Sequence, residues 1–164
     1  MLKFIVGIAL IAFTTFCGYL LSGKYRKRKA FFRQLRGFND RFINEISYFR
    51  RPIEEFVAGY PYNGDFAALL KSFFYRLKSS SAQDKTVLEL SNVTFLSEEE
   101  MHLIEDYFLM LGKGDSLSQK NYFSSVKEKL VKLESETEMQ AKRYGDLYIK
   151  IGFLCGLLFL ILIV

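Results

Sequence analysis

Apolar residues are concentrated at both ends of the chain, while the middle mixes apolar and polar positions. The first apolar run covers residues 4–21, and about 18 residues is near the lower limit for a helix that crosses a bilayer. The run therefore predicts a transmembrane helix. A cleaved signal peptide is the alternative interpretation, but no small-x-small cleavage site follows the run, and Phe16 before Cys17 disrupts a lipoprotein-type site. We expect the segment to remain in the mature protein.

The second apolar run covers residues 151–164. As a helix of about 14 residues it rises roughly 21 Å, less than the roughly 30 Å apolar core of a bilayer. Tyr144, Tyr148 and Lys150 precede it, and aromatic and long cationic side chains are typical of a membrane interface. Extended back to Leu147, the run predicts a second transmembrane helix in a locally thinned bilayer. A partner-binding tail is the alternative.

Basic residues directly follow the first apolar run. Positive charges this close to a span remain in the cytoplasm, so we expect the middle of the chain in the cytoplasm and both termini on the outer side. These basic residues, together with Tyr148 and Lys150, are predicted to lie at the membrane interface and to contact lipid head groups. Nucleic-acid binding is disfavoured because no base-stacking aromatic pattern accompanies the cluster. The basic residues are Lys24, Arg26, Lys27, Arg28 and Lys29.

Between the two runs, apolar residues recur in steps of three and four, which is the period of amphipathic helices. The first such stripe covers residues 31–49. Pro52 ends it, because the residue before a proline is pushed out of the helical region. Turn-forming residues at 59–64 separate a short helix at 53–58 from a longer one at 65–77.

Capping residues mark the later helices. Ser97 and the glutamates that follow it predict a capping box, and that helix is expected to stop at Gly112. Asp115 is expected to cap the last helix, whose stripe continues up to the second apolar run. Residues 84–90 are weakly helical. We predict an all-α fold in which a cytoplasmic bundle of about five to six helices at 23–147 lies between an N-terminal transmembrane helix at 1–22 and a C-terminal transmembrane helix at 148–164.

Composition supports one aromatic core and gives little support to catalysis. The 164 residues include 17 Phe and 10 Tyr, which supply large apolar side chains. Cys17 and Cys155 both lie in the apolar runs, so neither a disulfide framework nor a zinc site is expected. The single histidine, His102, is predicted to be solvated, and no nucleophile with a base, phosphate loop or metal-ligand spacing is present. We therefore expect no enzyme activity, cofactor, metal or small-molecule substrate.

Two patches of sequence resemble the stage III sporulation protein AB family. Residues 43–48 (INEISY) and 52–56 (PIEEF) look like its helix, proline and helix signature. Phe108, Leu111 and Gly112, with Asp115 and Gln119, look like its leucine-glycine turn, capping aspartate and following glutamine. The frame of two spans, with Tyr148, Gly152 and Gly156 at the second, is similar too. The chain departs from the family pattern in having no tryptophan near residues 87–90.

The resemblance implies a function and a location. It implies a non-enzymatic scaffold or platform subunit of the secretion-like channel complex between mother cell and forespore, required for endospore formation. It also implies a place in the mother-cell membrane that faces the forespore, and a fold related to the inner-membrane platform protein of type II secretion. Its implied partners are other subunits of the complex, with an assembly ATPase as one candidate, and the lipid bilayer. The alternative is a membrane-surface regulator that binds anionic lipid through the basic segment.

Two groups of residues follow from the resemblance. The structural group is Gly112, Asp115 and Gln119. The candidate partner-binding group is Glu45, Tyr48, Pro52, Glu54 and Glu55. Glu45 lies off the apolar stripe of its helix and is expected on an exposed face. Its alternative role is an ordinary solvated side chain paired with Arg41.

Overall fold

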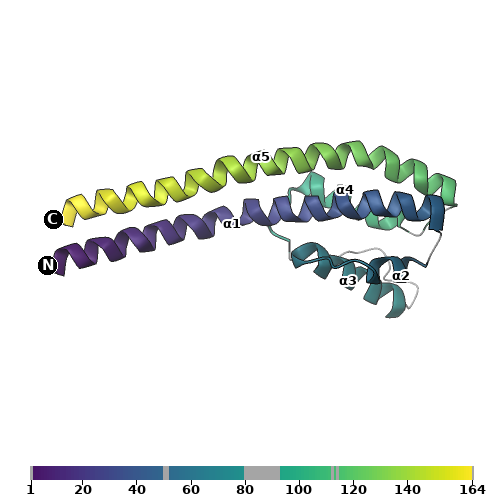
Figure 1. Cartoon of the computed structure of the whole chain (residues 1–164), viewed down its shortest axis with the longest axis horizontal. Helices are drawn as coiled ribbons and strands as arrows, with labels where there is room; N and C mark the ends of the chain where they lie inside the picture. The colour runs from purple at the N-terminus through teal and green to yellow at the C-terminus, as the bar shows by residue number, and fades with distance from the viewer. Residues whose placement is uncertain (1, 50–51, 80–92, 112, 114, 164) are drawn as a thin grey trace. The chain divides into compact units, whose positions relative to one another are not determined.

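The computed structural model describes the chain except for residues 1, 50–51, 80–92, 112, 114 and 164. Its described part consists of helices joined by turns and short irregular segments and contains no strand (Figure 1), which confirms the all-α prediction. The weakly helical segment expected at 84–90 and the helix stop expected at Gly112 lie outside the described residues. The elements are α1 (Leu2–Asn44), the π-helix η1 (Glu45–Phe49), α2 (Ile53–Ala58), α3 (Gly64–Ser79), α4 (Glu98–Met110) and α5 (Ser116–Ile163).

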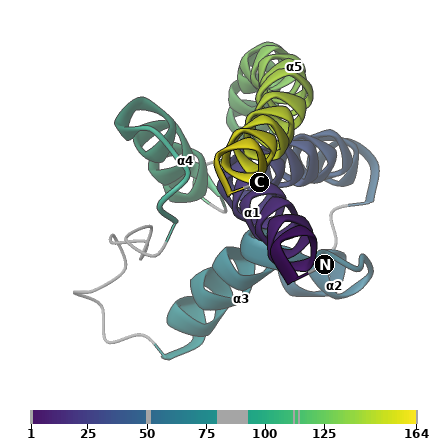
Figure 2. The same ribbon diagram turned by 90° about the vertical axis from the view of Figure 1, so that its left-hand side faces the viewer.

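These helices form two compact units. We call residues 1–29 with 135–164 the terminal hairpin, and residues 30–134 the central bundle. Packing defines these units, so they do not test the expected boundaries of the transmembrane segments. Within the central bundle, α2 and α3 lie on one side of α1 and α5 lies on the other (Figure 2).

Two helices run from the terminal hairpin into the central bundle without a break. α1 is 43 residues long and α5 is 48 residues long. The sequence predicts a span and a bundle helix in each of these regions, with helical spacing continued up to the second span, and in the structure each pair forms one continuous helix. The physical reason is local: residues 22–30 and 135–150 contain no proline and are rich in lysine, arginine and glutamate, which are good helix formers.

The end of α1 departs from the predicted regular stripe. Residues Glu45–Phe49 form a π-helix, in which each turn holds an additional residue and side chains shift around the axis. Ser47 donates its hydroxyl to the carbonyl of Ile43 at 2.8 Å. Pro52 then starts α2 with an extended backbone (ψ 137°), so the predicted break is confirmed while the turn before it is wider than expected.

Phe38 of α1 lies at the centre of an aromatic core. Its side chain is fully buried, and its ring centroid lies 5.5 Å from that of Phe56 in α2 and 5.9 Å from that of Phe66 in α3. Tyr107 of α4 lies at 6.3 Å. Tilted and edge-on ring pairs at such distances are favourable beyond the area that they bury. One side chain therefore links α1 to the three shorter helices.

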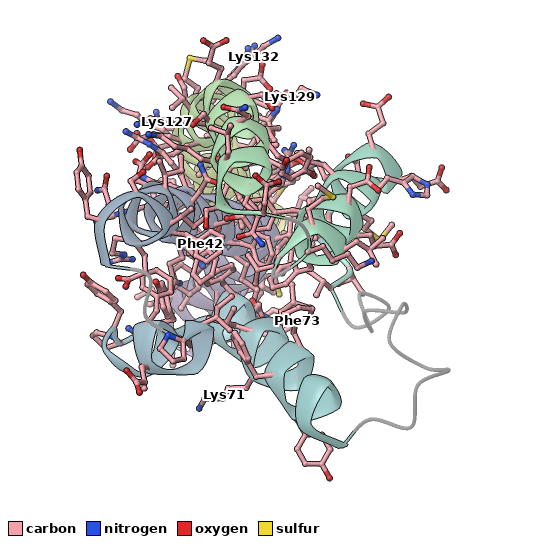
Figure 3. All side chains as sticks on the ribbon, turned by 90° about the vertical axis from the view of Figure 1, so that its right-hand side faces the viewer. Phe42, Lys71, Phe73, Lys127, Lys129 and Lys132 are labelled. Carbon is pink, nitrogen blue, oxygen red and sulfur yellow. The ribbon has the colours of Figure 1, made fainter. Side chains whose placement is uncertain are left out.

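The core continues toward α5. Phe42 meets Phe123 edge-on, with ring centroids 4.9 Å apart. Figure 3 shows Phe42 and Phe73 between the helices, whereas labelled lysines point outward from α3 and α5. These exposed residues are Lys71, Lys127, Lys129 and Lys132.

A buried amide ties three helices together. The Asn39 side chain is fully buried; its Nδ2 donates to the carbonyl of Phe123 at 3.1 Å, and its Oδ1 accepts from the Tyr107 hydroxyl at 3.2 Å. Burial raises the pKa of Tyr107 well above its usual value, so the hydroxyl stays protonated and able to donate. Because a buried polar group without a partner is costly, this network fixes the register of α1, α4 and α5.

A second amide holds the turn between α2 and α3. The Gln34 side chain donates to the carbonyl of Asn63 and accepts from its N–H, both at 2.8 Å. This pair of hydrogen bonds satisfies both backbone groups of Asn63. Gly64 follows with φ +63°, a conformation that favours glycine. The Arg41 guanidinium lies over the ring of Tyr60, 4.3 Å from its centroid. The turn predicted at 59–64 is therefore confirmed and anchored to α1.

Both predicted helix caps are confirmed. Ser97 and Glu100 form the reciprocal capping box of α4. The Asp115 carboxylate accepts from the N–H groups of Leu117 at 3.2 Å and Ser118 at 3.4 Å. Its hydrogen bonds with Ser118 lower the pKa of Asp115. Gln119 donates to the carbonyl of Lys113 at 3.0 Å, so both described members of the structural group stabilise the turn before α5.

Phe38→Ala should reduce the free energy of unfolding of the central bundle by about 3–5 kcal/mol, because it leaves a cavity where four helices meet. Thermal unfolding of the full chain in detergent, followed by circular dichroism, measures this. Tyr75→Ala is the matched control: Tyr75 is 74% exposed on α3, so its loss should change stability by no more than about 0.5 kcal/mol. Equal effects of the two substitutions would contradict the described core.

Candidate membrane-interface site

The terminal hairpin consists of two helices that are long and apolar enough to cross a membrane. The best 18-residue windows in α1 and α5 have mean hydropathy 2.0 and 1.9. Only 17% and 6% of those windows are buried inside the structure, whereas the core helix of a soluble protein is mostly buried. Large side chains such as Ile8, Phe13 and Leu154 are more than 60% exposed. These properties fit a two-pass membrane protein.

Glycines bring the two helix backbones into direct contact. A Cβ atom added at Gly152 would lie 2.5 Å from the carbonyl oxygen of Thr14, and one at Gly156 would lie 2.7 Å from the Cα of Ile11. A Cβ at Gly18 would overlap the carbonyl oxygen of Tyr148. Glycines four residues apart on one face are the usual means by which membrane helices approach closely. The glycines named in the sequence resemblance are therefore packing positions.

Hydroxyl groups in the apolar part of α1 bond within their own helix. Thr15 donates to the carbonyl of Ile11 at 2.7 Å, and Ser22 donates to that of Tyr19 at 2.7 Å. Thr14 donates to carbonyls in the preceding turn in the same way. Polar groups in hydrocarbon need such internal partners, so these residues do not disqualify the segment as a span.

Tyrosines from both helices meet where the apolar segments end. The ring of Tyr25 stacks on that of Tyr144 at 4.9 Å and on that of Tyr148 at 6.0 Å. Lys24 lies over the Tyr25 ring, 5.0 Å from its centroid. Tyrosine favours the interface between lipid and water. The contact therefore brings Lys24 and Tyr148, predicted separately as interface residues, to the same level of the hairpin.

The basic residues after the first span divide into two groups. Lys24, Arg26 and Lys27 are exposed, and the Arg26 guanidinium covers the Tyr19 ring at 3.8 Å. Lys29 instead forms an ion pair with Glu138 of α5 at 2.7 Å, and Arg28 donates to Gln140. The latter two side chains therefore contact α5, and the first three are the better candidates for lipid contact. Lys150 is also exposed.

Sequence reasoning did not identify Tyr25 and Arg143 as interface residues. Arg143 lies 5.9 Å from the ring centroid of Tyr144, and Tyr25 is central to the stacked rings. Both lie next to residues that the sequence predicts at the interface. Their position in the same juxtamembrane turns was therefore the signal that could have identified them. What the sequence lacked was the pairing across the two helices.

The predicted partner-binding residues lie around the π-helix and α2, in the central bundle. Tyr48 is 79% exposed, and Pro52 and Glu55 are exposed. The side chain of Glu54 lies outside the described part of the chain. The expectation that Glu45 is exposed is wrong, since only 5% of its surface is accessible. The reason is its position three residues after Phe42 and seven after Phe38, which places it on the same buried helix face as these two side chains.

Comparison with known proteins identifies the relatives of this chain. The sequence pattern of a protein family, described as stage III sporulation protein AB, matches residues 3–164. A protein of Bacillus subtilis (strain 168) named stage III sporulation protein AB is 25% identical over an alignment of 172 positions that covers 99% of each chain. No solved structure matches. The resemblance seen in the sequence is confirmed, and the relation to the type II secretion platform protein stays a prediction.

Gly152→Ala should destabilise the terminal hairpin by about 1–3 kcal/mol, because the new Cβ would collide with the backbone of α1. Gly145→Ala is the matched control on the same helix, since a Cβ there meets nothing within 4 Å. Replacing glycine by alanine raises helix propensity by the same amount at both positions, so this effect cancels in the comparison. Thermal denaturation of the full chain in detergent measures the difference. A hairpin held by close backbone contact predicts a lower melting temperature for Gly152→Ala alone; an equal change in both would contradict it.

Proposed function

Because the chain belongs to the stage III sporulation protein AB family, we propose that it is a two-pass membrane scaffold in endospore formation. In this proposal it is the platform subunit of the secretion-like channel complex between mother cell and forespore. It lies in the mother-cell membrane that faces the forespore, with its central bundle in the cytoplasm. Membership of the family supports the role in sporulation, and the more specific features are our proposal.

The observation that carries the proposal is the close packing of the terminal hairpin. Its two helices touch backbone to backbone at Gly18 and Gly152, present apolar side chains outward, and continue directly into the central bundle. An anchor of two helices in close contact restrains a cytoplasmic domain more than one flexible span would. A scaffold needs such an attachment, because its partners must meet it in a defined orientation.

The proposal assigns no catalytic step to the protein. Within the described ranges, no group of three or more His, Cys, Asp or Glu side chains is arranged to hold a metal ion. The side chain of His102 is 79% exposed and lies 3.6 Å from Glu105 on its own helix. A general base normally needs a second group that orients it beside a nucleophile. The proposed function therefore depends on binding surfaces.

We propose that the surface formed by Tyr48, Pro52 and Glu55 binds another subunit of the complex or its assembly ATPase. An exposed tyrosine supplies a large contact area at small entropic cost, and such residues are enriched at interaction sites. Tyr48 lies in the π-helix, and such turns often occur at functional sites. Glu45 is excluded from this surface because it is buried.

The alternative function is a membrane-surface regulator that binds anionic lipid through α1. The exposed positions of Lys24, Arg26 and Lys27, next to the stacked tyrosines, favour it. The regulator needs these charges and no partner surface. The scaffold, in contrast, would lose its function without the surface around Tyr48, even if these charges were retained.

Combined Tyr48→Ala and Glu55→Ala substitutions should reduce heat-resistant spores by about tenfold or more, because truncating the central residues of an interface commonly costs over 1 kcal/mol each. The variant should also lose its co-purifying complex subunits from sporulating cells. The host is an endospore-forming bacterium whose own family member has been deleted, and membrane levels are checked by immunoblotting.

The matched control for this surface is Tyr75→Ala with Glu99→Ala, which removes the same residue types from exposed positions on α3 and α4. It should sporulate normally. Normal sporulation of the Tyr48 and Glu55 variant, with failure after neutralisation of Lys24, Arg26 and Lys27, would favour the regulator and contradict the scaffold. Glu45 is unsuitable for this test because substituting a buried carboxylate changes stability as well as binding.

A further inference from the structure

One face of α5 in the terminal hairpin carries an open groove of about 480 Å³. Its residues recur at helical spacing just before the apolar end segment, so they form one continuous surface of the helix. Two of its residues, Arg143 and Lys150, belong to the membrane interface described above, and none belongs to the proposed scaffold surface. The groove is lined by Met139, Lys142, Arg143, Asp146, Leu147 and Lys150.

The groove combines positive charge with apolar contact surface. Lys142, Arg143 and Lys150 supply three cations, against the single carboxylate of Asp146, and all four side chains are exposed. An anion in the groove would therefore meet a net attraction. Asp146 opposes an anion, and its removal should strengthen the binding of one.

An exposed apolar stripe continues from the groove along the same helix. Leu147 is 44% exposed, Ile151 46%, Leu154 61% and Leu158 58%. Their spacing of four, three and four residues puts them on one face. If the cations bind the head-group phosphate of a lipid, the acyl chain of that lipid can therefore lie along the stripe.

We propose that this face binds one anionic phospholipid, with the head-group phosphate at Lys142, Arg143 and Lys150 and an acyl chain along the stripe. Charge complementarity selects an anion, and the adjoining apolar stripe selects a lipid over a free phosphate. Long cationic side chains at the end of a span reach the head-group region in this way. The inference rests on the two-span anchor of the proposed function, and it does not require any protein partner.

The test uses the full chain reconstituted in phosphatidylcholine bilayers with trace spin-labelled phosphatidylglycerol or phosphatidylcholine. Electron spin resonance measures the motionally restricted fraction of each lipid, and hence the selectivity for the anionic one. The combined substitutions Lys142→Gln, Arg143→Gln and Lys150→Gln should reduce this selectivity at least about twofold. Circular dichroism confirms that helicity is retained.

The matched control is Lys120→Gln, Lys129→Gln and Lys132→Gln, which removes the same charge from exposed positions of α5 in the central bundle. It should keep the wild-type selectivity. Asp146→Asn is a second variant that leaves every cation in place, and it should raise the selectivity. The proposal would be overturned if the groove variant kept the wild-type selectivity, or if the control variant lost as much selectivity as the groove variant. It would also be overturned if Asp146→Asn did not raise the selectivity.

Soluble glycerol phosphate distinguishes a lipid from a free anion. At millimolar concentration it should leave the restricted fraction of phosphatidylglycerol unchanged, because it lacks the acyl chains that contact the stripe. Displacement by glycerol phosphate would overturn the lipid assignment. A negative result here leaves the scaffold untouched, since spore formation by the Tyr48 and Glu55 variant is measured separately.

Discussion

Backbone contact between α1 and α5 is the constraint on which the account of this protein depends. In lipid the hydrophobic effect does not drive helices together, so their pairing must come from close packing and polar contacts. Gly18 and Gly152 allow that approach because each faces a backbone carbonyl of the other helix. Once the helices touch there, their apolar side chains face outward and Tyr25 meets Tyr144 at the end of the apolar segment. A two-helix anchor and a defined membrane interface follow from the same contact.

The central bundle is held together by a different kind of contact. Aromatic side chains around Phe38 form the centre of its core, and Asn39 fixes how the helices align. A well-packed bundle can present exposed residues such as Tyr48 in a constant geometry, which is what the proposed scaffold role requires. Anchoring and partner binding are therefore assigned to separate units, each with its own stabilising contacts.

Local features of this fold could be predicted from the sequence, and contacts between distant segments could not. The caps at Ser97 and Asp115 depend on residues within one helical turn, so their residue types were sufficient. The burial of Glu45 was missed because the apolar stripe passes from Phe42 to Ile46, whereas Glu45, three residues after Phe42, lies on the same buried face. The ion pair of Lys29 with Glu138 joins residues far apart in the chain. The basic cluster was therefore recognised, but not the contacts of Arg28 and Lys29 with α5.

Cross-linking between α1 and α5 in native membranes tests the antiparallel hairpin most directly. Tyr25→Cys and Tyr144→Cys are combined with Cys17→Ser and Cys155→Ser, so that only the two positions whose rings stack at 4.9 Å carry thiols. A short thiol cross-linker should join them within one chain, and the exposed Met139→Cys in place of Tyr144→Cys should react far less. Links formed only between chains, or equally from both positions of α5, would contradict the hairpin and the anchor that it provides.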